Sequence, residues 1–309
     1  MSGTAPSGST RRAPERSPAI SARMANAAAG SQQDGLANLI STVQMTGPTD
    51  GKCMWHLGTV TGLDQTHRAA IAWIVANAIM DDRGGGSRAA ATWRSAALAG
   101  SRLAGSDREM VAAFVTGVFG LPPRGKSKTH VVGHVAEWLW YLHARHALSL
   151  TRKVELLETP KFNVTEPGAD GFIVYTDSSS GETIFRLWEI KQHVGGSPVS
   201  DTVTDAYGQL KTHATRYLAQ LTSVHSAING PVGDLCKQLV DFWIDSNSRA
   251  GVGVSVASAT TPAPATCFST MGNHFPGFTR AGQLEGLLLA VEDLEDLALE
   301  VRGYLWTAL

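Results

Sequence analysis

Two carboxylates and a lysine near the middle of the sequence have the types and the spacing of a hydrolytic metal site. Glu189 and Lys191 are two residues apart in LWEIKQH, and Asp170 directly precedes the apolar run GFIVYT. Residues two apart on a strand project to the same face, so Glu189 and Lys191 should lie together while Ile190 points away. A hairpin between the two runs would place Asp170 beside them, at the same end of the sheet.

These side chains suit the hydrolysis of a phosphodiester bond. Mg²⁺ prefers carboxylate oxygens and keeps several waters, so Asp170 and Glu189 are predicted to hold Mg²⁺ or Mn²⁺, with the Ile190 carbonyl as a further ligand. Such an ion would neutralise the phosphate and activate water. Lys191 would orient or deprotonate that water or stabilise the developing charge. Glu137, the one carboxylate in the apolar segment GHVAEWLWYL, is predicted to assist the metal or the water and completes the catalytic set.

The elements that must position these residues can be read from the pattern of apolar residues. A helix over residues 128–148 should precede three strands, in VELLETPKFNV, GFIVYT and TIFRLWEIKQH. Two helices, a strand over residues 249–258 and an amphipathic C-terminal helix in GQLEGLLLAVEDLEDLALEVRGYLWTAL should follow. This order predicts an α/β (α+β) core with a mixed sheet flanked by helices. The expected divisions are a disordered tail (1–34), a helical accessory region (35–123) and the domain that carries the site (124–309).

The order of the candidate residues resembles that of the PD-(D/E)XK nuclease superfamily, over residues 128–258. In that family a helix carries a glutamate, the next hairpin carries an aspartate, and the following strand carries Glu-x-Lys, which correspond here to Glu137, Asp170 and Glu189-Ile190-Lys191. The family's Pro-Asp pair is not literal, because Pro167 stands three residues before Asp170. The resemblance implies a restriction-endonuclease-like core and metal-dependent cleavage of DNA.

Within that superfamily, the segments GHVAEWLWYL, GADGF, LWEIKQH and RAGVGVSVAS resemble the nuclease subunit of a bacterial phage-defence system of the Hachiman type. This resemblance implies an antiviral effector with a helicase (ATPase) partner. The partner would dock on the acidic stretch Glu285–Glu300 or on the helical region 35–123. Some superfamily members carry a glutamine and a tyrosine near the site, on the helix after the third strand, and Gln209 and Tyr217 are their counterparts here.

Composition limits where nucleic acid could bind. The 309-residue chain has a formal net charge of −1, so a nucleic-acid site must be local. Basic residues outnumber acidic ones between Leu121 and Lys161, which predicts a basic groove there. The residues predicted to contact nucleic acid are Arg124, Lys126, Lys128, Arg145, Lys161 and Gln209.

The sequence also carries predictions about location. No apolar run is long enough to span a bilayer, and the basic N-terminus lacks the apolar stretch of a secretory signal. Three scattered cysteines show no zinc-ligand spacing, which favours a reducing compartment. We therefore expect a cytoplasmic protein that does not interact with membranes.

Other functions remain open at this point. The chain could be a stand-alone restriction-type endonuclease, or a non-catalytic binding or regulatory protein that keeps the fold. Residues 120–127 formally fit the phosphate-loop pattern GxxxxGKS, but Pro122 and Pro123 remove amide donors and a helix is expected before them. His130 and His134 form HxxxH without the glutamate of HExxH, so we expect them on the surface or facing DNA rather than on zinc.

Overall fold

The computed structural model describes residues 18–31, 35–45, 53–147, 152–162, 168–178, 180–259 and 266–309. The predicted disordered tail, 1–34, therefore lies largely outside the described residues. Its described part contradicts the prediction, because Ala22–Gly30 forms a helix, α1, whose start is capped by the Ser21 hydroxyl accepting from the Met24 amide. The small side chains of α1 allow close packing, and Asn26 accepts a hydrogen bond from the Trp73 indole at 2.9 Å.

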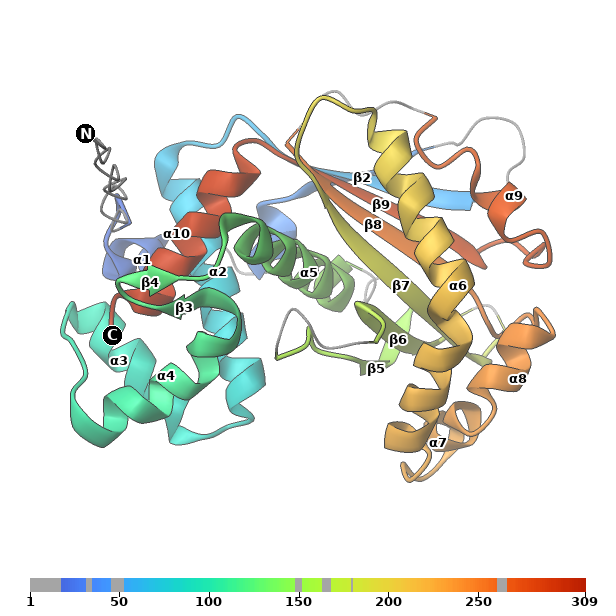
Figure 1. Ribbon diagram of the computed structural model, residues 1–309, viewed down its shortest axis with the longest axis horizontal. Coiled ribbons are helices and arrows are strands. Elements are labelled where there is room, and N and C mark those ends of the chain that lie inside the picture. The colour runs from blue at the N-terminus through green and yellow to red at the C-terminus, as the bar shows by residue number, and fades with distance from the viewer. Residues whose placement is uncertain are drawn as a thin grey trace, which may run out of the picture.

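One mixed seven-stranded sheet organises the described residues, in the order β1-β2-β9-β8-β7-β6-β5 (Figure 1). The four central strands β2, β9, β8 and β7 run parallel to one another, and β1, β6 and β5 are antiparallel to their neighbours. The predicted mixed α/β fold with flanking helices is confirmed. The strand bounds are β1 Ser41–Met45, β2 Cys53–Val60, β5 Lys153–Leu157, β6 Gly171–Thr176, β7 Thr183–His193, β8 Val252–Ser258 and β9 Leu284–Val291.

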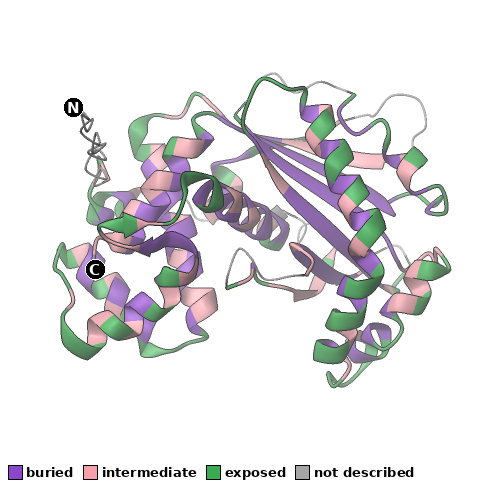
Figure 2. Ribbon diagram, in the orientation of Figure 1, coloured by how far each residue is buried: buried purple, intermediate pink, exposed green. Residues whose placement is uncertain are grey.

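Helices cover both faces of this sheet. α5 packs on one face together with α2 and α10, and α6 packs on the other, so the strands between them are buried (Figures 1 and 2). No described helix is long and apolar enough to cross a membrane. Besides α1, the helices are α2 Gln65–Gly84, α3 Arg88–Ala99, α4 Gly105–Phe119, α5 Lys128–Ala147, α6 Val199–His225, α7 Pro231–Cys236, α8 Leu239–Ile244, α9 Met271–His274 and α10 Leu294–Trp306, with a 3₁₀ turn at Gly35–Asn38.

The region 35–123 is helical over α2, α3 and α4, but the prediction of a helical accessory region is wrong at its start. β1 and β2 are strands of the main sheet, and β2 pairs in parallel with β9 along its whole length. Trp55 and Val60 of β2 are buried among residues far away in sequence. The segment is too short and too mixed in composition for its periodicity to identify a strand. Its burial depends instead on tertiary contacts.

The C-terminal segment was predicted as one amphipathic helix, and this is also wrong in its first half. Leu284–Val291 is a fully buried strand between β2 and β8, and only Leu294–Trp306, α10, is helical. A run that is apolar on both faces is typical of a central parallel strand. Gly286 is required there, since a Cβ would lie 2.8 Å from Trp55 and from Phe268. Glu285, predicted within an acidic docking surface, is consequently buried in the sheet.

The phosphate-loop alternative is contradicted by the local fold of residues 120–127. A helix, α4, precedes this segment, which folds as a short hairpin of β3 Gly120–Leu121 and β4 Arg124–Gly125. The Lys126 amide donates to the Phe119 carbonyl at 3.2 Å, so it is used within the protein. A phosphate loop instead follows a strand and turns its amides toward the ligand.

Candidate active site

The candidate site lies at the start of β6, where β7 extends beyond its pairing with β6 while it stays paired with β8 on its other side. β6 pairs with β7 only as far as Gly171 opposite Trp188. Asp170 stands directly before β6, and its Oδ2 accepts a hydrogen bond from the Ile190 amide at 3.0 Å. The Asp170 side chain thus accepts the hydrogen bond that a backbone carbonyl of β6 would accept if that strand extended further. Glycine at 171 is needed because a Cβ would lie 2.4 Å from the Trp140 ring of α5.

Glu189 and Lys191 project to the same side of β7, as the two-residue spacing predicts. The Lys191 ammonium contacts Glu189 Oε1 at 2.5 Å, whereas Ile190 packs in the core on the α5 side of the sheet. Glu189 is fully buried, and its Oε2 has no hydrogen-bond partner among the described residues. The carboxyl groups of Glu189 and Asp170 lie within hydrogen-bonding reach of each other. Two acids therefore share one buried space with one lysine.

Burial and mutual repulsion dominate the electrostatics of this group. Burial first, and the neighbouring Asp170 second, raise the pKa of Glu189 to about 8, although Lys191 opposes the shift. Burial and Glu137 also raise the pKa of Asp170. Burial alone would lower the pKa of Lys191, but Glu189 and Asp170 outweigh it and leave this pKa raised. Lys191 is therefore an ammonium at neutral pH, which favours orientation and charge stabilisation over the alternative of deprotonating water.

Glu137 reaches the same site from α5. Burial raises its pKa to about 8, against the attraction of Lys161, Arg83 and Lys191. Its Oε2 lies 3.2 Å from Nδ1 of His134, which is fully buried. The prediction that His134 faces the surface or DNA is therefore wrong. His134 was placed outward because its four-residue spacing from His130 suggested a common exposed face, but only His130 is exposed.

A pocket of about 370 Å³ opens beside Asp170. Lys161 lines it, and its ammonium lies 5.9 Å from the centre of the Tyr217 ring of α6. Gly168, with φ of +147°, makes room for this lysine, since a Cβ there would lie 2.1 Å from Nζ. Tyr217 and Gln220 line the pocket, but Gln209 does not. Of the two predicted α6 counterparts, the structure thus brings only Tyr217 to the site.

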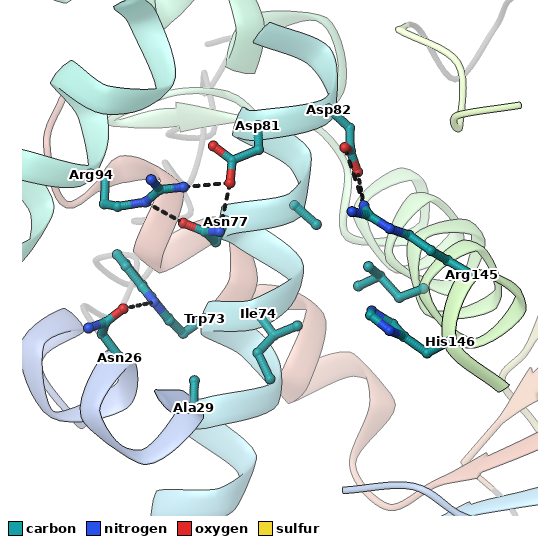
Figure 3. A pocket seen from close by; sticks show the side chains of 12 residues that line it. Asn26, Ala29, Trp73, Ile74, Asn77, Asp81, Asp82, Arg94, Arg145 and His146 are labelled. Atoms are coloured by element: carbon teal, nitrogen blue, oxygen red, sulfur yellow. Dashed lines mark hydrogen bonds and ion pairs between the residues drawn. The ribbon is translucent and has the colours of Figure 1, made fainter. Parts of the chain in front are cut away.

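The remaining predicted nucleic-acid contacts lie elsewhere. Lys128 forms an ion pair with Glu295 of α10, and the backbone carbonyl of Lys126 accepts from Arg302. Arg145 reaches from α5 to Asp82 of α2, 3.2 Å away, on the wall of a different pocket (Figure 3). Arg124 is exposed in the β3–β4 hairpin. Of the basic residues predicted to form one groove, only Lys161 lines the pocket beside Asp170.

The carboxylate pair fits a hard divalent cation. Glu189 Oε2 is a buried acceptor that lacks a donor, and Asp170 supplies a second carboxylate next to it. The amide and carbonyl of one strand residue point to the same side, so the Ile190 carbonyl faces the gap that Asp170 occupies. No group of three or more His, Cys, Asp or Glu side chains among the described residues is arranged around a common metal position. Mg²⁺ needs only one or two carboxylates, because it retains waters.

One residue next to the site gave no signal in the sequence. Arg83, at the end of α2, contacts His134 and the carbonyl of Lys161 at 2.5 and 2.7 Å. Because Arg83 stands in the last turn of an apolar helix, the sequence fits an exposed side chain equally well. Only the packing of α2 against α5 turns it toward the site.

No protein-family model matches the sequence, and no curated protein is significantly similar to it. The function is therefore argued from the geometry of the site.

Proposed function

We propose that this protein is a divalent-metal-dependent nuclease that hydrolyses phosphodiester bonds in DNA, with a restriction-endonuclease-like core. The observation that carries the proposal is the buried group of Asp170, Glu189 and Lys191 at the start of β6. It has two carboxylates in reach of each other, one unpartnered oxygen and one ammonium. Strongly perturbed acids that share one cation in a cleft are typical of catalytic sites.

The proposed reaction adds water across one P–O bond of the backbone. The water oxygen bonds to phosphorus, the sugar oxygen leaves with a proton, and the other proton of the water passes to a base. A divalent cation on Asp170 and Glu189 would supply charge neutralisation and a lowered pKa for water. Lys191, as an ammonium, orients the phosphate and stabilises its developing negative charge. Glu137 is the proton acceptor, because a pKa of about 8 suits a base near neutral pH.

Lys161 gives the substrate a cationic contact next to this group. Its ammonium lies at the pocket beside Asp170, where a phosphate flanking the cleaved bond would pass. DNA as substrate, a helicase partner and a role in phage defence stay predictions of the resemblance. With the acidic stretch partly buried in β9, the exposed remainder on α10 and the helices α2–α4 are the surfaces left for such a partner.

A cleavage assay tests the proposal. The full chain is incubated with plasmid, linear duplex and single-stranded DNA, with Mg²⁺ or with EDTA, alongside Asp170→Asn and Lys191→Ala. Cleavage that needs Mg²⁺ and falls at least about 100-fold in both variants is expected. Lys153→Ala is the matched control, because Lys153 also pairs with a glutamate two residues away, Glu155, but on the exposed edge strand β5.

Two results would contradict the nuclease. One is no cleavage of any probe, including an RNA probe, which would favour the binding or regulatory alternative. The other is equal cleavage by the wild type and the Lys191→Ala variant. Cleavage of duplex DNA with a sequence preference and without added protein would instead identify a stand-alone restriction-type enzyme.

A further inference from the structure

A fully buried histidine connects the candidate base to the helical region. His134 of α5 has its Nδ1 3.2 Å from Glu137 Oε2. Its other ring nitrogen, Nε2, lies 2.5 Å from a guanidinium nitrogen of Arg83 and 2.8 Å from the indole nitrogen of Trp138. Both ring nitrogens are therefore engaged, each by a different kind of partner.

The chemistry of these partners fixes where the imidazole proton sits. Guanidinium and indole N–H groups donate hydrogen bonds and cannot accept them. Nε2 must therefore be the unprotonated acceptor, and the single proton of the neutral ring lies on Nδ1, from which it is donated to Glu137. A second proton on Nε2 would face two donors at once, next to the positive charge of Arg83. Burial and Arg83 accordingly lower the pKa of His134 well below its usual value.

We infer that His134, held in this tautomer by Arg83 and Trp138, is a positioning residue for Glu137; the functional part of this inference rests on the proposed nuclease. The Nδ1–H donor holds one carboxylate oxygen of Glu137 and leaves the other for water at the site. Arg83 also donates to the carbonyls of Lys161 and of Phe114 in α4, at 2.7 and 3.3 Å. Through Arg83, the end of α2 thereby holds His134 against Glu137 and also holds the backbone of Lys161.

A pair of substitutions separates this role from simple packing. The amide nitrogen of asparagine can occupy the position of Nδ1, so His134→Asn keeps a donor for Glu137. Glutamine places its amide near Nε2 instead, so His134→Gln keeps an acceptor for Arg83 but loses that donor. We expect kcat to fall about 10- to 100-fold in His134→Gln and clearly less in His134→Asn, with KM little changed in both. Equal losses in the two variants would overturn the inference.

Arg83 is tested with a conservative rescue. Arg83→Met should lower kcat about tenfold, and Arg83→Lys, which restores a cationic donor, should recover part of that loss. His143 is the control histidine, because it is also buried on α5, and the groups whose charges act on it are His56 and His146 rather than Glu137. His143→Asn and His143→Gln should give the same kcat as each other. A kcat unchanged in Arg83→Met would remove Arg83 from the proposal.

The tautomer has a readout that does not depend on activity. Long-range ¹H–¹⁵N spectra of the histidine-labelled full chain distinguish protonated from unprotonated ring nitrogens, and His134→Asn assigns the signal. We expect Nδ1 protonated and Nε2 bare from pH 6 to pH 8. A proton on Nε2 would overturn the inference even if the protein is a nuclease. If the wild type cuts no probe, the nuclease fails, and the spectra alone decide whether His134 donates to Glu137.

Discussion

The sheet buries two groups of charged residues, and they are compensated in opposite ways. At β9, Glu285 is almost fully buried but accepts from Arg152, Arg186 and Tyr175, at 2.6, 3.1 and 2.8 Å. Burial would raise the pKa of Glu285, yet the two arginines outweigh it and leave that pKa lowered. Beside the start of β6, Glu189 is also buried, but its pKa rises to about 8.

The difference lies in the ratio of cations to carboxylates. The Glu285 group provides two guanidinium groups and a hydroxyl for one carboxylate, so each buried charge has a partner. The pair of Asp170 and Glu189 has two carboxylates for one directly bonded lysine, Lys191, and one oxygen of Glu189 has no donor among the described residues. A buried charge left uncompensated costs free energy, and a fold keeps it only where something else supplies the missing charge. We therefore interpret the first group as structural and the second as functional.

The largest expected effect is on stability, from Glu285→Gln. Removing the carboxylate leaves two buried arginines without their partner, which should cost about 3–5 kcal/mol. Glutamine has the shape of the neutral, protonated Glu189 that a pKa of about 8 implies, so the metal-free Glu189→Gln protein should be unchanged or more stable. Chemical denaturation in EDTA measures both. Similar destabilisation by the two substitutions would contradict the distinction between a structural group at Glu285 and a functional group at Glu189.

Activity should respond in the reverse order. Glu189→Gln should lower cleavage at least about 100-fold, which corresponds to about 2.7 kcal/mol in the barrier. Glu285→Gln should keep the specific activity of its folded fraction, because Glu285 contacts none of the site residues. The assay compares initial rates at a temperature where circular dichroism shows both variants folded. A loss in Glu285→Gln as large as that in Glu189→Gln would make the two groups one functional unit.

Mg²⁺ should stabilise only the protein with an intact carboxylate pair. At about ten times its dissociation constant, a bound ion adds about 1.4 kcal/mol to the free energy of unfolding. That corresponds to roughly 2 °C in Tm for a chain of this size. Differential scanning calorimetry of the wild type, Asp170→Asn and Glu285→Gln should show the increase in the first and third proteins. An equal increase in Asp170→Asn would place the ion elsewhere.

The last effect concerns pH in the absence of metal. Glu189 and Glu137 have an ordinary pKa of 4.5 and a folded-state pKa of about 8. The folded state therefore holds protons that the unfolded chain releases, and stability falls as pH rises between these values. We expect a loss of about 1 kcal/mol per pH unit in EDTA between pH 6 and pH 8, reduced in Glu189→Gln. Stability that rises over this range would contradict the raised pKa values.

Much of the local structure follows from nearby residues. Asp64 caps the start of α2, where its Oδ1 accepts from the amide of His67, three residues on, at 2.8 Å. The spacing of Glu189 and Lys191 predicted their common face, since strand geometry alone fixes it. The large apolar rings of Trp138, Trp140 and Trp188 are buried in the core. The helix cap and the common face follow from short-range geometry, and the burial of the tryptophans follows from their large transfer free energy.

The sequence by itself determined the mixed α/β class and the three residues whose grouping follows from strand geometry, Asp170, Glu189 and Lys191. Tertiary structure decided that β2 and β9 are strands, because these two segments pair with each other across more than 200 residues of sequence. It also decided that Glu285 is neutralised while Glu189 is not, and that Arg83 and His134 belong beside Glu137. A pKa or a tautomer depends on which charges and donors lie within a few ångströms, and only the folded chain brings those together.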